Sequence, residues 1–169
     1  MAPDEIIAEI DQSTALLVTH LAKFNDTQFN QRPADDSWSA AEVTEHLLLI
    51  ETRINNALGR GVPTDRAPDK KIELMREALR DPARKFPAPE FVVPSTAYKV
   101  CRKMAELMIM QRGILKEILQ TTNLTQTTEF KHPVLGRLTR LEWIYFNIYH
   151  TERHCRQLAR IAREVVTSA

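Results

Sequence analysis

Residues 139–161, TRLEWIYFNIYHTERHCRQLARI, contain two histidines at a spacing of four, His150 and His154. On an α-helix, residues four apart lie on one face, about 6 Å apart along the axis. The stripe that holds both histidines also carries Phe146, Asn147, Arg153, Gln157 and Ile161. This stripe is too polar for an ordinary core face. The two histidines are therefore either satisfied core or surface residues, or a chelating pair for one metal ion.

Capping signals predict where this helix and an earlier one begin. In the pattern Ser/Thr-x-x-Glu, the hydroxyl and the carboxylate satisfy backbone N–H groups that have no partner at a helix start. The pattern occurs at residues 139–142 and again at residues 39–42. It predicts one helix from residue 139 to about residue 166. It predicts another from residue 39 to about residue 58, where Gly59 ends it.

Two further helices are predicted from apolar residues that recur at helical spacing. The first runs from Asp4 to about residue 31, with Asp4 after Pro3 as its N-cap. The other begins at Ser95, again as an N-cap, and runs to about residue 120. The chain has only 4 glycines and 7% aromatic residues, and its apolar residues recur at helical rather than alternating spacing.

A long proline-rich connection joins the second and third of these helices. Residues 61–94 contain six of the nine prolines, and residues 70–80 could form one short helix within the connection. The remainder stays non-helical, because proline removes backbone donors and restricts the residue before it. Loops of this length are usually functional covers or disordered. Packing across the helices is favoured by the apolar residues Phe86, Phe91, Val92 and Val93.

These elements predict an all-α fold, a single four-helix bundle domain over residues 1–169 with one long crossover loop. The net charge of +1 excludes field-driven binding to nucleic acid or to an anionic membrane. No signal peptide is visible and no apolar run reaches the ~20 residues of a membrane span, so a cytoplasmic location is expected. Cys101 and Cys155 have no CxxC spacing and are expected to be small buried hydrophobes.

A third histidine, His46, lies about two turns into the second helix. If the second and fourth helices are neighbours, His46, His150 and His154 can supply three nitrogen ligands to one divalent metal ion. Three histidines leave at least one coordination position open, as in catalytic zinc sites, and nickel, iron or manganese would accept the same ligands. Such an ion lowers the pKa of a bound water or thiol and generates a nucleophile at neutral pH.

The motif around the two spaced histidines differs from those of zinc peptidases. The HExxH motif needs a glutamate general base where this chain has Thr151. The reversed HxxEH motif needs a glutamate where Arg153 stands. Glu152 lies roughly 200° around the helix from His150. Ordinary zinc peptidase chemistry is therefore disfavoured.

Several residues near the predicted ligands could take part in a site. Arg153 and Gln157 could orient a substrate carboxylate or a ligand imidazole, and Arg153 could equally pair with an acidic residue on a neighbouring helix. Glu90 of the crossover is one candidate base, with a metal-bound hydroxide as the alternative. Trp38 is expected to pack at the helix entrance and His132 to be structural. The possible pocket also includes Arg53 and Asn147.

Two stretches of the chain resemble the DinB-like (DinB/YfiT) family of four-helix-bundle proteins. They are RPADDSWSAAEVTEHLLLIE at residues 32–51 and HPVLGRLTRLEWIYFNIYHTERHCRQL at residues 132–158. The resemblance implies an up-down-down-up bundle, a divalent metal bound by the three histidines, and a homodimer. Members with known activity are metal-dependent thiol transferases and isomerases that use low-molecular-weight thiols such as bacillithiol or mycothiol. Others are called metal-dependent hydrolases, and many have no known reaction.

The combined pattern supports three hypotheses about function. The first is a metal-dependent enzyme in which the three-histidine site, with zinc or nickel as the leading metals, activates a thiol or water for attack on a small electrophile. The second is a noncatalytic, stress-linked protein that binds a metal or ligand. The third is a helical dimerisation module without metal, which the placement of the histidines disfavours. An open coordination position supports the enzyme, whereas a fourth protein ligand supports a structural metal.

Overall fold

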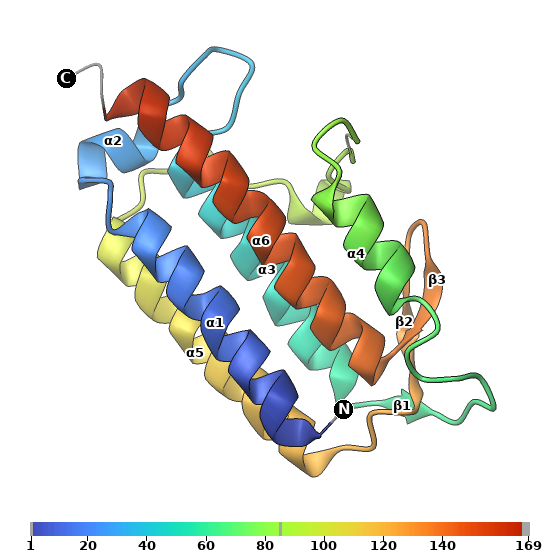
Figure 1. Cartoon of the computed structure of the whole chain (residues 1–169). Coiled ribbons are helices and arrows are strands. Elements are labelled where there is room, and N and C mark those ends of the chain that lie inside the picture. Colours follow the sequence, from blue (N-terminus) through green and yellow to red (C-terminus); the bar gives the residue numbers. More distant parts are fainter. Residues whose placement is uncertain (1, 85, 167–169) are drawn as a thin grey trace.

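Four long helices lie side by side in this computed structural model, which describes residues 2–84 and 86–166 (Figure 1). They are α1 (Pro3–Leu21), α3 (Ala40–Leu58), α5 (Cys101–Thr121) and α6 (Arg140–Val165). Helix α1 contacts α5 and α6, and α3 contacts the same two helices. Figure 1 shows α1 and α6 running in one direction and α3 and α5 in the other. The predicted up-down-down-up four-helix bundle is confirmed.

Both predicted capping boxes are present. The Ser39 hydroxyl accepts from the Glu42 N–H at 3.2 Å, and the Glu42 carboxylate accepts from the Ser39 N–H at 2.8 Å. Thr139 and Glu142 make the same reciprocal bonds at 3.1 and 2.9 Å. These bonds satisfy donors that a helix start leaves free. They start α3 and α6, the two helices that carry the three histidines, at the residues that the sequence indicates.

The first predicted helix is two helices in the structure. Helix α1 ends at Leu21, and a short helix α2 spans Asp26–Asn30. The break is explained by Asn25, whose side chain accepts from the Gln28 N–H at 2.8 Å and caps the new helix. At the other end, Pro3 occupies the first helical position, where its missing N–H costs nothing, so Asp4 lies in the first turn and is not the N-cap.

Helix α5 begins six residues later than the predicted start at Ser95. The Ser95 N–H and hydroxyl instead bind the Glu45 carboxylate of α3, at 2.6 and 3.1 Å. The first backbone donor of α5, the Cys101 N–H, is satisfied by Asp26 of α2 at 2.8 Å. A side chain from a distant part of the sequence therefore caps this helix, and no local signal at Ser95 could reveal it.

The crossover between α3 and α5 contains three short elements. They are β1 (Gly61–Val62), α4 (Ile72–Arg80) and the 3-10 helix η1 (Glu90–Val92). Helix α4 packs on α6 and buries Met75 and Leu79, while η1 contacts α3 and buries Val92. The segment thus lies across the bundle as predicted. Its other apolar residues do not all pack, because Phe86, Phe91 and Val93 stay exposed.

A small antiparallel sheet closes one end of the bundle and was not predicted. Its strands are β1, β2 (Thr127–His132) and β3 (Gly136–Thr139), in the order β1-β2-β3. The turn between β2 and β3 contains Pro133, and Gly136, with a φ of 66°, follows it as the first residue of β3, close to where the sequence indicated a turn. The three strands are short and partly exposed, so the apolar alternation that reveals longer strands is weak in them.

The interior consists of two apolar clusters separated by a buried polar layer. One cluster centres on Trp143 and Tyr145 near the sheet, and the other on Phe29 and Leu158 near α2. Between them lies a set of buried polar side chains, one or two from each long helix: Ser13, Glu51, Asn55, Gln111, Arg112 and Thr151. Within residues 2–84 and 86–166, no helix has the length and apolar character needed to cross a lipid bilayer.

Candidate metal centre

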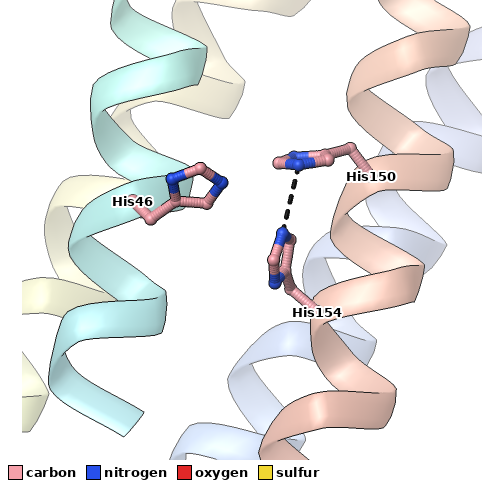
Figure 2. A group of neighbouring side chains, drawn as sticks. All are labelled: His46, His150 and His154. Carbon is pink, nitrogen blue, oxygen red and sulfur yellow. Dashed lines mark hydrogen bonds between the residues drawn. The ribbon is translucent and has the colours of Figure 1, made fainter. Parts of the chain in front are cut away.

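The structure brings the three histidines together between α3 and α6. His46 comes from α3, and His150 and His154 from successive turns of α6, with their rings directed toward one another (Figure 2). The Nε2 atoms of His150 and His154 are 3.1 Å apart, and one nitrogen from each of the three rings lies within 4.8 Å of the other two. Over the described ranges, this is the one group of three or more His, Cys, Asp or Glu with metal-ligand spacing.

Two of the three rings have their second nitrogen held by an oxygen. His46 donates its Nδ1–H to the Val92 carbonyl of η1 at 2.8 Å, and His154 donates its Nδ1–H to Gln157 Oε1 at 2.8 Å. A proton on Nδ1 leaves Nε2 as the free lone pair, and such outer bonds fix the orientation of a ligand ring. His46 and His154 thus present Nε2 to the space between the helices.

Burial keeps all three imidazoles neutral at neutral pH. Their exposed fractions are 5% for His46 and 8% each for His150 and His154. Burial is the main cause that lowers the pKa of each ring; for His154 the pKa falls to about 3, and His46 adds to this effect. Metal binding requires neutral imidazole, so the site needs no proton release at pH 7 before it can hold an ion.

The donor set fits a divalent ion. Zinc holds imidazole nitrogens at about 2.0–2.1 Å, which places pairs of ligand atoms about 3–4 Å apart. The 3.1 Å separation on α6 already has this spacing, and the other pairs lie within 4.8 Å. No fourth acidic, Cys or His side chain joins the group in the described parts of the chain. The arrangement suggests a divalent metal with an open coordination position.

Two aromatic side chains pack directly against the histidine rings. The Trp38 ring lies 5.1 Å from the His46 ring, centroid to centroid, so Trp38 packs directly on a candidate ligand. Phe146 stacks on His150 at 5.1 Å with an interplanar angle of 14°. His132 packs against Phe146 at 5.0 Å, while its Nδ1 accepts the Val134 and Leu135 N–H groups of the hairpin turn. His132 therefore has the structural role that its turn position indicated.

The two arginines of the predicted pocket bind the crossover segment. Arg153 donates to the carbonyls of Leu79 and Asp81 at 3.3 and 3.0 Å and also to the carbonyl of Arg84, and its guanidinium lies 5.2 Å from the Phe86 ring centre. It thus binds backbone carbonyls rather than the acidic partner that was one alternative. Arg53 donates to the Phe91 carbonyl at 3.3 Å and lies 4.6 Å from that ring. Both arginines fasten the crossover beside the histidines.

The remaining candidate residues are placed differently. Gln157 orients His154, which was one of its two expected roles. Asn147 is 1% exposed on α6, and neither atom of its amide has a hydrogen-bond partner. Glu90 is exposed at the start of η1. Both cysteines are buried and free, and burial raises the pKa of Cys155 to about 12, which makes it a poor nucleophile.

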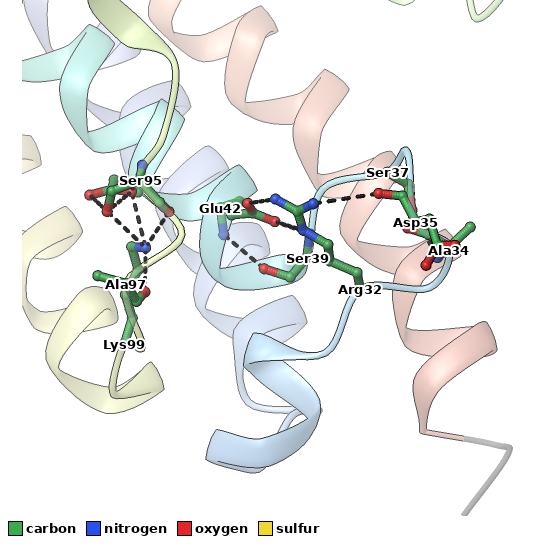
Figure 3. Close-up of polar contacts among 10 residues, drawn as sticks. Arg32, Ala34, Asp35, Ser37, Ser39, Glu42, Ser95, Ala97 and Lys99 are labelled. Atoms are coloured by element: carbon green, nitrogen blue, oxygen red, sulfur yellow. Dashed lines mark hydrogen bonds and ion pairs between the residues drawn. The ribbon is translucent and has the colours of Figure 1, made fainter.

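Ion pairs anchor the start of α3 and hence His46 (Figure 3). The Glu42 carboxylate, already bonded to Ser39, also receives two bonds from Arg32. One turn along, Glu45 binds Ser95 and pairs with Lys99 at 3.1 Å, which attaches the segment before α5. The sequence indicated the cap role of Glu42 but not these partners, because Arg32 lies in a loop and Lys99 fifty-four residues away from Glu45.

Comparisons with known proteins agree with this architecture. The model of the DinB superfamily matches residues 9–158. The chain is similar to the uncharacterized protein YuaE of Bacillus subtilis (strain 168), with 29% identity over 147 residues, covering 86% of this chain and 90% of YuaE.

Two solved structures share the fold. The four-helix bundle protein TT2238 matches with a TM-score of 0.60 and 18% identity, over 94% of this chain and 99% of TT2238. YfiT from Bacillus subtilis matches with a TM-score of 0.61 and 16% identity, over 95% of this chain and 86% of YfiT. YfiT is described as a probable metal-dependent hydrolase with an unusual four-helix bundle topology.

Proposed function

Because this chain belongs to the DinB superfamily, we propose that it is a metal-dependent enzyme whose ion is held by His46, His150 and His154. The observation that carries the proposal is the convergence of three buried, neutral imidazoles with no fourth protein ligand among the described residues. An open position suits catalysis rather than a purely structural ion. The description of YfiT as a probable metal-dependent hydrolase supports the same class of chemistry.

The proposed reaction is attack of water or a small thiol on a small electrophile. A divalent ion in such a site lowers the pKa of a bound water or thiol enough to supply a nucleophile at neutral pH. Zinc and nickel are the leading candidates, since imidazole suits both, and iron or manganese are alternatives. A low-molecular-weight thiol is the proposed co-substrate, and a homodimer the proposed assembly.

The surrounding residues would hold the ligands rather than react. Val92 and Gln157 orient two of the rings through Nδ1. Trp38 and Phe146 pack on the rings of His46 and His150. Arg53 and Arg153 keep the crossover in contact with the bundle. Because both cysteine thiols are buried with raised pKa values, the thiol of the proposed reaction comes from a co-substrate and not from this chain.

Metal content offers the first test. Protein purified without a histidine tag should bind about one divalent ion per chain, measured by elemental analysis and by competition with a chelator. His150→Ala should abolish stoichiometric binding, because a chelate of three loses one arm. His20→Ala is the matched control, since His20 is a half-buried histidine of α1 outside the cluster. Equal metal content in wild type and His150→Ala would exclude the site.

An activity assay distinguishes water from a thiol as the nucleophile. The metal-loaded protein is incubated with an electrophilic probe and several low-molecular-weight thiols, and conjugates are measured by mass spectrometry; hydrolysis of an activated ester is followed in parallel. Thiol conjugation that needs both metal and the intact cluster supports the transferase. Ester hydrolysis alone supports the hydrolase, and tight metal binding with neither reaction supports a noncatalytic binding protein.

A further inference from the structure

Asn55 Oδ1 and Arg112 Nε of the central polar layer have no hydrogen-bond partner, and neither do four buried polar atoms nearer the histidine cluster on α3 and α6. These four atoms are Glu51 Oε2 on α3, both amide atoms of Asn147, and His150 Nδ1 on α6. The exposed fractions of these residues are 0%, 1% and 8%. Leaving a buried donor or acceptor unpaired destabilises the fold, because the group has lost its water without gaining a partner. Four such atoms on neighbouring helices therefore call for a shared explanation.

Helix packing places Asn147 between the other two residues. Helices α3 and α6 run antiparallel, and they are joined near the cluster by the Thr151 hydroxyl, which lies 3.4 Å from Glu51 Oε1. Asn147 lies one turn before Thr151 and three residues before His150. Around the helix it is about 40° from Thr151 and about 60° from His150. Asn147 thus lies on the part of α6 between the histidine site and the side that contacts Glu51.

The unpaired atoms are chemically complementary. The other Glu51 oxygen, Oε1, accepts from Arg112 at 2.5 Å, so Oε2 remains as an acceptor. An amide offers Nδ2 as a donor to that carboxylate and Oδ1 as an acceptor for an imidazole N–H. When His150 binds an ion through Nε2, its remaining proton lies on Nδ1 and requires an acceptor, as His46 and His154 already have.

We propose that Asn147 is a positioning residue that links the ligand His150 to the buried Glu51–Arg112 pair. His150 Nδ1–H donates to Asn147 Oδ1, and Asn147 Nδ2–H donates to Glu51 Oε2, through bonds that are direct or bridged by one ordered water. This inference rests on the proposed function in one respect, namely that the three histidines hold a metal ion. It gives each ligand ring its own oxygen partner: Val92, Gln157 and Asn147.

An amide at this position suits both states of the site. In the metal-free cluster, His154 carries its proton on Nδ1, so the 3.1 Å contact between the two Nε2 atoms requires a proton on His150 Nε2. His150 Nδ1 is then an acceptor, which the NH₂ of Asn147 can satisfy. With an ion bound, the amide turns over, so that its oxygen accepts from Nδ1–H and its NH₂ faces Glu51 Oε2; the bond to Glu51 therefore belongs to the metal-bound state. A carboxylate could satisfy only the second state.

The test compares Asn147→Leu with a matched control, Asn55→Leu. Asn55 is a buried amide of the same polar layer, but it bonds to Gln111 of α5 and to no histidine. The affinity for Zn²⁺ is measured by chelator competition, and the free energy of unfolding of the metal-free protein by urea titration. Asn147→Leu should lower the Zn²⁺ affinity about 10- to 100-fold. The unfolding free energy of the metal-free protein should fall by less than the corresponding loss of binding free energy. Asn55→Leu should leave the Zn²⁺ affinity within about twofold of wild type.

Histidine-labelled ¹⁵N NMR spectra supply a readout that does not depend on metal binding. In the metal-free protein, Asn147→Leu should shift the Nδ1 resonance of His150 and leave those of His46 and His154 in place. An unchanged His150 resonance, or equal losses of Zn²⁺ affinity in the two amide variants, would overturn the link. If wild-type protein binds no metal while the His150 shift is observed, the proposed function fails and the contact between Asn147 and His150 stands. Should Asn147→Leu fail to fold, Asn147→Ala serves for both measurements.

Discussion

At the scale of single residues, the burial of the three histidines determines how the protein responds to pH. Their imidazoles lie in a low-dielectric interior beside one another, so the charged form is disfavoured. An unfolded chain has no such constraint, and its histidines protonate near pH 6.5. The same feature that prepares the rings for a metal therefore makes the metal-free fold sensitive to acid.

The metal-free protein should lose stability between pH 7.5 and pH 5. The pKa of His154 falls to about 3 on folding, so below pH 6.5 the unfolded chain binds more protons than the folded one. The fold is therefore most stable above the unfolded pKa. The free energy of unfolding decreases as the pH falls below it, by roughly 1.4 kcal/mol per pH unit for each fully buried ring. Urea unfolding across this range measures the slope. His154→Gln should have a shallower slope, and a slope equal to that of wild type would contradict this account.

At the scale of elements, the serines that precede α3 and α5 have different roles. Ser39 caps α3 through a hydroxyl that is 2% exposed, whereas Ser95 precedes α5 without capping it. We expect Ser39→Ala to reduce the free energy of unfolding by about 1 kcal/mol. Ser95→Ala should reduce it by less than about 0.5 kcal/mol, since its hydroxyl bond to Glu45 is exposed. Equal effects in thermal or urea unfolding would contradict the assignment of the two caps.

Arg153 of α6 holds residues 79–84 of the crossover, next to the exposed Phe86. Arg153 bonds three carbonyls between residues 79 and 84, whereas Phe86 is 46% exposed. Arg153→Met keeps the aliphatic stem but removes these donors, so proteolysis within residues 81–94 should become several-fold faster. Limited proteolysis with mass spectrometry measures the cleavage rate. Arg160→Met, an exposed arginine of the same helix, is the control and should cleave at the wild-type rate.

At the scale of the whole molecule, the arginine of a buried ion pair bonds to side chains of the other three long helices. Arg112 of α5 bonds Glu51 of α3 and Thr151 of α6, and it also reaches Ser13 of α1 at 3.5 Å. The pair lies between the two apolar clusters. Buried ion pairs contribute little net stability compared with apolar replacements, but breaking one leaves a charge stranded in the interior.

Removing one partner should therefore be worse than removing both. Arg112→Met leaves the Glu51 carboxylate fully buried without its cation, and we expect a loss of about 3–5 kcal/mol in the free energy of unfolding. The double variant Arg112→Met with Glu51→Leu should recover most of that loss. Urea unfolding of the four proteins in this double-mutant cycle provides the measurement. A double variant that is less stable than Arg112→Met would show that the pair stabilises the fold directly.

The sequence by itself determined the features that arise within a few residues. The capping boxes at residues 39–42 and 139–142, the spacing of His150 and His154, and the helical periodicity all depend on contacts between residues three or four apart. Such contacts form in any chain with that local sequence. They predicted the two helices that carry the histidines and the placement of His150 and His154 on one helix face.

Only the tertiary structure decided which distant groups meet. The adjacency of α3 and α6 brings His46 to the other histidines, Asp26 caps α5, and Val92 reaches His46 across 46 residues. The sheet and the buried layer around Arg112 arise in the same way. These contacts depend on how apolar faces pack after the helices form, and many distant pairings are compatible with the same local pattern. Spacing along the chain therefore predicted that His150 and His154 share one helix face, while packing brought His46 to them.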